Sequence, residues 1–126
     1  MLTWLLLGTG LYLLTLYVPS LFLAPHIGLG KYLGSRDEEP VVNALHGRAQ
    51  RAARNFRENY PVFMALGILT LVLPDVDAGQ AALGAMLFVL ARLAYLPFYL
   101  LPVLMLRSVF YIVGLIGLGL MALALI

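Results

Sequence analysis

A run of charged side chains leads directly into an apolar segment in this chain. Between Arg48 and Glu58 the sequence holds five charged residues and one asparagine, and it becomes apolar from Pro61 onward. On a helix that turns about 100° per residue, four polar residues of this run fall within an arc of roughly 80°: Arg48, Arg51, Asn55 and Glu58. We call these four residues the polar stripe. Such a stripe is costly against lipid, so we expect it to face protein or a polar ligand.

The composition indicates an integral membrane protein. The chain has 126 residues, of which 63% are hydrophobic and 11% charged, whereas soluble domains are typically about 45–50% apolar and about 25% charged. Four apolar segments can be drawn, at about 2–24, 41–73, 80–101 and 103–126. A helical segment of 23 residues is roughly 35 Å long, enough for a bilayer core of about 30 Å. We therefore predict an all-α, four-helix membrane bundle that forms one domain, residues 1–126.

Several kinds of chemistry are excluded or disfavoured by residue content. The chain has no cysteine, which rules out disulfides, a cysteine nucleophile and thiolate metal sites. His26 and His46 lack the spacing of metal ligands, so no metal site is expected. No exposed basic face remains once the apolar segments are drawn, and nucleic-acid binding is therefore not supported.

The placement of charge predicts an orientation in the membrane. Region 25–59 holds six of the eight basic residues, whereas the turn 74–79 holds two Asp and no basic residue. The positive-inside rule therefore places region 25–59 in the cytoplasm and the turn outside. With four spans, both termini lie outside. The connection near Pro102 then lies on the cytoplasmic side, together with Arg107 and the polar stripe.

Two further polar clusters are expected at the depth of the stripe. One shares a helix face about 60° wide in segment 80–101 and consists of Arg92, Tyr95 and Tyr99. The other begins segment 103–126 and consists of Arg107, Ser108 and Tyr111. An arginine at the centre of a membrane helix costs about 2.5–3.5 kcal/mol, so Arg92 needs a partner, and Glu58 is the only acidic residue within an apolar segment. An excess of arginine over carboxylates predicts a pocket for an anion.

Structural roles compete with this interpretation. Arg92 and Glu58 could form only an interhelical ion pair that fixes packing. Two arginines off the stripe, Arg54 and Arg57, fit better as anchors that face anionic headgroups, and Arg48 could do the same. The tyrosines of segment 80–101 could be interface aromatics. The glycines of segment 103–126 could permit close helix approach or could simply be tolerated there.

The stripe and its flanking residues resemble the signature of the MAPEG family, the membrane-associated proteins in eicosanoid and glutathione metabolism. The matching residues are Arg51, Asn55, Glu58 and Pro61. The pattern Arg92-x-x-Tyr95-x-x-x-Tyr99 resembles the third-helix motif of leukotriene synthase-like members. The pair Arg107-Ser108 resembles the start of the fourth helix in the prostaglandin E synthase branch. Ala53 stands where that branch has a histidine, which argues against prostaglandin specificity.

The resemblance implies a homotrimer of four-helix bundles with glutathione, a co-substrate, bound between neighbouring subunits near the cytoplasmic side. It implies that lipophilic electrophiles or lipid hydroperoxides react with the glutathione thiol. The short first loop is similar to that of bacterial members of the family. This similarity implies a location in a bacterial inner membrane. The residues expected to act on the thiol are Arg107 and Ser108. The residues expected to bind glutathione are Arg48, Arg51, Asn55, Glu58, Arg92, Tyr95, Tyr99 and Tyr111.

A second class of function is also compatible with the sequence. The chain could be a non-catalytic membrane module that binds anionic lipid or partner helices, as some family relatives do. A small transporter fits less well, because the half of the bundle away from the stripe has almost no polar residues to line a path.

Overall fold

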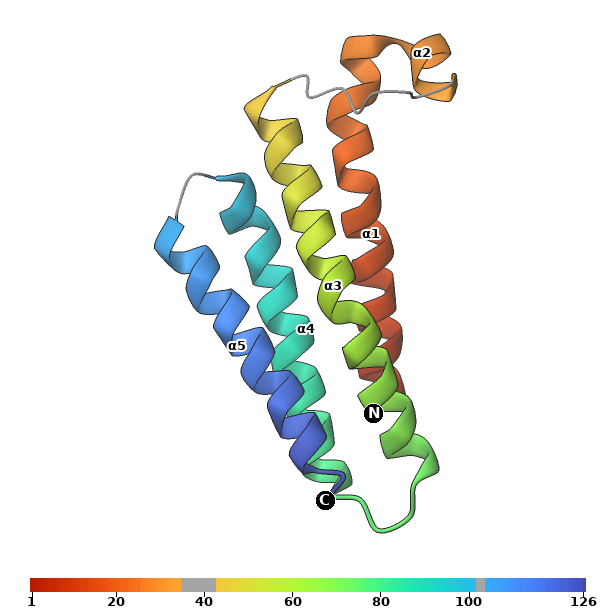
Figure 1. Cartoon of the computed structure of the whole chain (residues 1–126), viewed down its shortest axis with the longest axis vertical. Helices are drawn as coiled ribbons and strands as arrows, with labels where there is room; N and C mark the ends of the chain where they lie inside the picture. Colours follow the sequence, from red (N-terminus) through yellow and green to blue (C-terminus); the bar gives the residue numbers. More distant parts are fainter. Residues whose placement is uncertain (35–42, 102–103) are drawn as a thin grey trace.

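The computed structural model describes residues 1–34, 43–101 and 104–126, and its regular structure over these residues is entirely helical (Figure 1). The helices are α1 (Leu2–Ile27), α2 (Leu29–Leu33), α3 (Ala44–Val72), α4 (Ala78–Leu100) and α5 (Leu104–Leu123). The all-α prediction is thus confirmed. The four long helices correspond to the four predicted apolar segments, whereas α2 lies where a loop was expected. The predicted connection at Pro102 falls outside the described residues.

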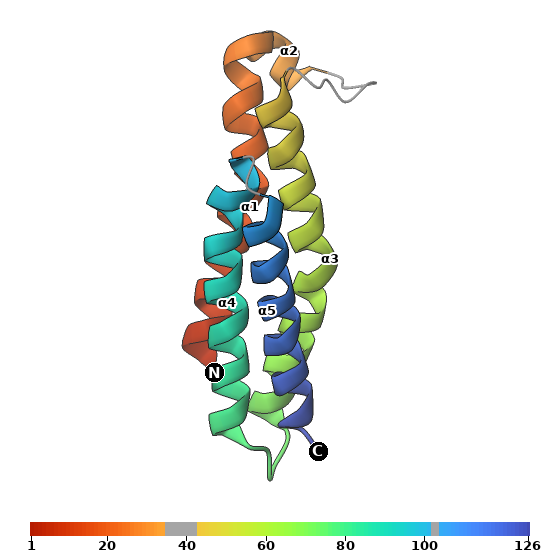
Figure 2. The same cartoon turned by 90° about the vertical axis from the view of Figure 1, so that its left-hand side faces the viewer.

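The long helices lie side by side as two closely packed pairs. α1 packs against α3, and α4 packs against α5 over an extensive contact (Figures 1 and 2). α3 also contacts α4 and α5, which joins the two pairs. Both chain ends and the α3–α4 turn lie toward one end of the molecule, and α2 lies at the other (Figure 1). At the first end, the Asp77 N–H donates a hydrogen bond of 3.0 Å to the Ala124 carbonyl.

Side-chain caps fix the starts of two helices. The side-chain oxygen of Asn43 accepts a hydrogen bond of 2.8 Å from the His46 N–H at the start of α3. The carboxylate of Asp77 accepts one of 2.9 Å from the Gln80 N–H at the start of α4. Each cap satisfies an amide that has no partner within the helix. The cap at Asn43 thus fixes the start of α3, the helix that carries the polar stripe.

Three of the long helices are long and apolar enough to cross a membrane, judged by length and composition. The qualifying stretches are Leu2–Pro25, Ala78–Phe98 and Met105–Leu123. α3 does not qualify, so the prediction of four spans is supported for three. The reason is the stripe itself, because only the 14 residues Asn59–Val72 of α3 follow its charges, and they extend roughly 20 Å. The hydrocarbon core of a bilayer is about 30 Å thick.

Two glycines let α4 and α5 pack backbone to backbone. A Cβ on Gly117 would lie 2.6 Å from the Gly84 carbonyl oxygen, and one on Gly84 would lie 2.5 Å from the Gly117 carbonyl oxygen. No side chain larger than hydrogen fits at this crossing. The predicted role of close approach therefore holds for Gly117. It does not hold for Gly119, where a Cβ would meet nothing within 4 Å.

Aromatic packing joins the two helix pairs. Phe63 of α3 and Phe88 of α4 are both fully buried, and their rings stack with centroids 4.6 Å apart. Phe56 packs edge-on against Phe88 at 6.0 Å, about two turns before Phe63 and nearer the α2 end (Figure 1). A second, smaller cluster begins there with buried Ala52 and Tyr95. This second cluster forms the floor on which the candidate site is built.

Candidate functional site

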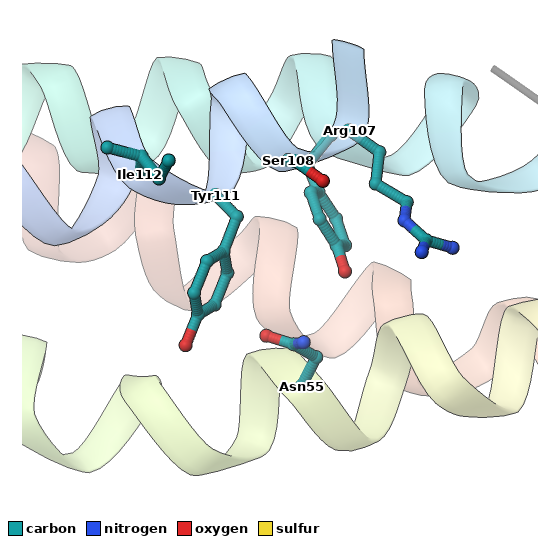
Figure 3. A pocket seen from close by; sticks show the side chains of 6 residues that line it. Asn55, Arg107, Ser108, Tyr111 and Ile112 are labelled. Atoms are coloured by element: carbon teal, nitrogen blue, oxygen red, sulfur yellow. The ribbon is translucent and has the colours of Figure 1, made fainter. Parts of the chain in front are cut away.

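A cavity of about 280 Å³ opens between α3 and α5 (Figure 3). We call it the α3–α5 cavity. It is lined by Asn55 of α3, Tyr95 of α4, and four residues of α5: Arg107, Ser108, Tyr111 and Ile112. Five of these six residues are polar. Figure 3 shows Asn55 pointing from α3 toward α5, with Tyr111 and Arg107 reaching toward α3 from the other side.

Helix periodicity accounts for the α5 wall. Arg107 and the residues one, four and five positions after it fall within an arc of about 140° around a helix, and these are the residues that line the cavity. Tyr95 is buried at 5% exposure, Arg107 and Tyr111 are half-buried, and Ser108 and Ile112 are exposed. The cavity therefore has a buried floor and a mouth on the surface of the single chain.

Arg92 lies next to this cavity but does not line it. Its side chain is 2% exposed, and its guanidinium carbon lies 5.3–5.4 Å from the ring centroids of four aromatic residues, Phe56, Phe88, Tyr95 and Tyr111. A cation over aromatic faces is stabilised by the ring quadrupoles. Two of these rings, Tyr95 and Tyr111, belong to the cavity wall. Arg92 thus supports the wall from the interior of the molecule.

The hydrogen-bond partner of Arg92 is Asn55 and not Glu58. Arg92 Nη1 donates to Asn55 Oδ1 across 3.4 Å, whereas Glu58 is exposed. The predicted ion pair between Arg92 and Glu58 is therefore wrong. Asn55 lies about two turns before the apolar part of α3, and it faces α4. Its side-chain amide, and not the Glu58 carboxylate, therefore lies within hydrogen-bond distance of the Arg92 guanidinium. Arg92 Nε and Nη2 are buried and have no hydrogen-bond partner among the described residues.

A second cavity of about 210 Å³ lies along the polar stripe. We call it the stripe cavity. It is lined by Arg51, Arg54, Asn55 and Glu58. Arg51 and Glu58 are exposed, so this cavity faces outward from the single chain. Asn55 lines both cavities, so one amide borders the cavity that Arg51 lines and the cavity that Arg107 lines.

The remaining predicted site residues are less closely associated with these cavities. Arg48 is half-buried, one turn before Arg51, and its Nε is buried without a hydrogen-bond partner among the described residues. The side chain of Tyr99 lies outside the described part of the structure. Sequence reasoning did not select Ile112, although it follows Ser108 by four residues and shares its helix face. The expected convergence of all three arginine clusters is partial, since Arg92 is enclosed by aromatic rings.

A sequence model of the MAPEG family matches residues 1–126, which is the whole chain. No curated protein matches the chain, and no solved structure matches it.

Proposed function

Because the chain belongs to the MAPEG family, we propose that it is a membrane-embedded, glutathione-dependent transferase or peroxidase. Its second substrates are lipophilic electrophiles or lipid hydroperoxides. The observation that supports this most directly is the position of Asn55, which borders a cavity with Arg107 and Ser108 and another with Arg51 and Glu58. An elongated ligand with charges at several points fits two cavities that meet at one amide.

Glutathione matches this arrangement by charge. The tripeptide carries two carboxylates, one ammonium and one thiol. In the proposal, Glu58 binds the ammonium and Arg51 binds a carboxylate, because guanidinium and carboxylate pair through two parallel hydrogen bonds. Arg48, one turn away, adds positive charge on the same side of α3. Asn55 and Tyr95 bind the middle of the ligand, and the thiol lies in the α3–α5 cavity beside Arg107.

The proposed assembly is a homotrimer in which residues 1–126 form one four-span domain. The exposed positions of Arg51, Glu58 and Ser108 support it, because these polar side chains need cover within a membrane. A neighbouring subunit would shield the face of α3 that carries Arg51 and Glu58 from lipid and complete the site. In the proposed orientation the site lies toward the cytoplasm, both termini lie outside, and the host membrane is a bacterial inner membrane.

Arg107 is proposed to hold the thiol of glutathione in its anionic form. A free thiol has a pKa of about 8.5, so only a few per cent is thiolate at neutral pH. An adjacent cation lowers that pKa, and a shift of one unit corresponds to about 1.4 kcal/mol and about tenfold more thiolate. A guanidinium keeps its charge throughout this range. The hydroxyl of Ser108 or Tyr111 can donate a hydrogen bond to the sulfur.

The same nucleophile serves either reaction. With an electrophilic carbon, the sulfur electron pair forms a C–S bond and the displaced pair takes a proton or departs with the leaving group. With a lipid hydroperoxide, attack on oxygen breaks the O–O bond and leaves the lipid as an alcohol, and a second glutathione then forms the disulfide with release of water. The apolar substrate would reach the exposed Ile112 side of the cavity from the bilayer.

The test measures the ultraviolet absorbance of the glutathione thiolate bound to the purified protein in detergent. We expect a thiolate signal at neutral pH in the wild type and its loss in Arg107→Ala. Lys31→Ala is a matched control, because Lys31 is an exposed cation on α2 that lines neither the α3–α5 cavity nor the stripe cavity. An equal thiolate signal in Arg107→Ala and wild type would remove Arg107 from this role.

Thermal stability separates an enzyme from a non-catalytic module. A ligand that binds the folded state alone stabilises it by about 2.7 kcal/mol at a hundredfold excess over Kd. We expect glutathione to raise the unfolding temperature of the wild type and to do so less in Glu58→Gln. No effect of glutathione on the wild type would favour the non-catalytic alternative.

A further inference from the structure

A third cavity lies between α1 and α3, on a different side of α3 from the α3–α5 cavity. Its volume is about 250 Å³, and we call it the α1–α3 cavity. It is lined by Leu16, Pro19 and Ser20 of α1 and by Gln50, Ala53, Arg54 and Arg57 of α3. Arg54 also borders the stripe cavity, whereas Arg57, Gln50 and Ser20 border only this one among the cavities described. No role in the proposed reaction falls to these three residues.

The polar part of this cavity is complementary to an anion. Gln50, Arg54 and Arg57 recur at helical spacing on one face of α3, and Ser20 adds a hydroxyl from α1. The lining contains two guanidiniums and no carboxylate. Within the described part of the chain, neither guanidinium has an ion pair or a hydrogen bond. Two unpaired arginines with neutral donors beside them form a typical phosphate-binding group.

On the α1 side, the surface beside the cavity is apolar and belongs to a candidate membrane span. On α1, Leu13 and Tyr17 fall within about 60° of Ser20 around the helix axis, and they are 49% and 66% exposed. Both lie in the span Leu2–Pro25. Acyl chains would therefore run along α1 directly beside the arginines.

The depth also fits a headgroup. Ser20 lies five residues before Pro25, the last residue of the α1 span, and this separation is roughly 8 Å along a helix. Long arginine side chains can lay their apolar stems along apolar surface and extend their charged ends toward a nearby interface. Both side chains are exposed and so can reach a ligand from the bilayer.

From these observations we propose that the α1–α3 cavity binds the phosphate of an anionic phospholipid, whose acyl chains lie along α1. The guanidiniums of Arg54 and Arg57 pair with the phosphate oxygens, and Gln50 and Ser20 donate further hydrogen bonds. An anionic headgroup is favoured over a zwitterionic one, because the lining offers no carboxylate for a choline or ethanolamine cation. This site would tie α1 to α3, and among its lining residues only Arg54 also borders the stripe cavity of the proposed glutathione site.

The experiment titrates the delipidated protein in detergent with phosphatidylglycerol, phosphatidylcholine or inorganic phosphate, and follows the unfolding temperature. We expect phosphatidylglycerol to raise it in the wild type and phosphatidylcholine to leave it unchanged. Arg57→Gln should weaken the apparent affinity for phosphatidylglycerol about fivefold, and Arg54→Gln/Arg57→Gln should weaken it further. Lys31→Gln, which removes the same charge outside the cavity, should bind like the wild type.

Other outcomes would overturn the proposal. Equal stabilisation by inorganic phosphate would identify a site for free phosphate, and equal weakening in Lys31→Gln would indicate a general charge effect without a site. If the double variant does not fold, the single variant Arg57→Gln still decides the matter. The thiolate absorbance of bound glutathione should be the same in Arg57→Gln and wild type, so failure of the lipid site leaves the proposed reaction untouched, and the reverse also holds.

Discussion

Arg92 donates a hydrogen bond from Nη1 to the side-chain oxygen of Asn55 across 3.4 Å, and this contact joins α4 to α3 beside the candidate site. The bond is longer than the usual N–H···O range of about 2.7–3.2 Å, so it is a weak partner for a buried cation. Most of the surroundings of the guanidinium are aromatic rings. The arrangement implies that Arg92 is retained at a cost in stability.

Replacing Arg92 with an apolar residue of similar length tests that cost. Burial of an ion costs several kcal/mol, while cation–π contacts return about 2 kcal/mol or more when desolvated. We expect Arg92→Met to leave the free energy of unfolding in detergent unchanged or to raise it by about 1–4 kcal/mol. Arg92→Ala should lower it by about 2–5 kcal/mol, because it leaves a cavity. A Met variant clearly less stable than the wild type would show that the aromatic cage outweighs desolvation.

The Asn55 contact can be measured by a double-mutant cycle. Asn55→Ala removes the one hydrogen-bond acceptor that Arg92 has among the described residues and should cost about 1–3 kcal/mol in the wild type. In the Arg92→Met background the same change should cost less, since no charge is left unpaired. Asn59→Ala is the control on the same helix, because within the described part of the chain the Asn59 side chain donates only to the Asn55 backbone carbonyl. Equal costs of Asn55→Ala in both backgrounds would show that the contact contributes nothing.

The long helices were predictable from the sequence because their apolar runs are long and end at clear signals. The predicted segment 80–101 differs from α4 (Ala78–Leu100) by at most two residues, since Asp77 caps its start and the run of apolar residues sets its length. α2 was missed because Gly28, Gly30 and Gly34 are strong turn signals. A helix of five residues between glycines has too short a pattern to detect.

The site was predictable only in part, because helical spacing gives the direction of a side chain and not its neighbour. Spacing correctly grouped Arg107 with Ser108 and Tyr111 on one wall of a cavity. It could not show that the Arg92 guanidinium lies over the Phe56 ring, because that contact depends on how α3 packs on α4. The width of the stripe also matters, since Asn55 and Glu58 are about 60° apart around α3. Asn55 faces α4, and Glu58 is exposed.

The crossing of α4 and α5 should tolerate no side chain at Gly117. A Cβ there would lie 2.6 Å from the Gly84 carbonyl oxygen and 2.8 Å from the Phe88 nitrogen. Both are backbone atoms, so the helices must separate, and we expect Gly117→Ala to destabilise the protein by about 1–3 kcal/mol. Gly119→Ala, two residues away and open on all sides, should have no effect or stabilise by up to about 1 kcal/mol. Similar unfolding temperatures for the two variants would contradict the close crossing.

The start of α4 should depend on the carboxylate of Asp77. This carboxylate accepts the Gln80 N–H at 2.9 Å, so Asp77→Ala should cost about 0.5–2 kcal/mol. Asp75 is the control in the same turn, and its φ of 58° is one that asparagine also tolerates. Asp75→Asn should therefore be nearly neutral in thermal unfolding. An equal loss in both variants would point to the charge of the turn and not to the cap.

Tyr60 and Thr9 join α3 to α1 through a hydrogen bond of 2.8 Å between their hydroxyls. Thr9 Oγ1 donates its single proton to the Leu5 carbonyl at 2.7 Å, so the Tyr60 hydroxyl must be the donor to Thr9. Tyr60→Phe removes this proton but retains the ring, which stacks on Tyr12 with centroids 4.0 Å apart. The change should therefore report the hydrogen bond alone, at about 0.6 kcal/mol and at most about 1.7 kcal/mol within a membrane protein.

The measurement is the free energy of unfolding of Tyr60→Phe, Thr9→Val and the double variant in detergent. Because both single changes remove the same bond, the double variant should lose less than the sum of the two losses. Tyr17→Phe, at a ring that is 66% exposed, controls for loss of a hydroxyl at the membrane surface and should be neutral. Fully additive losses would show that the two hydroxyls act independently and that the bond between them does not hold α1 to α3.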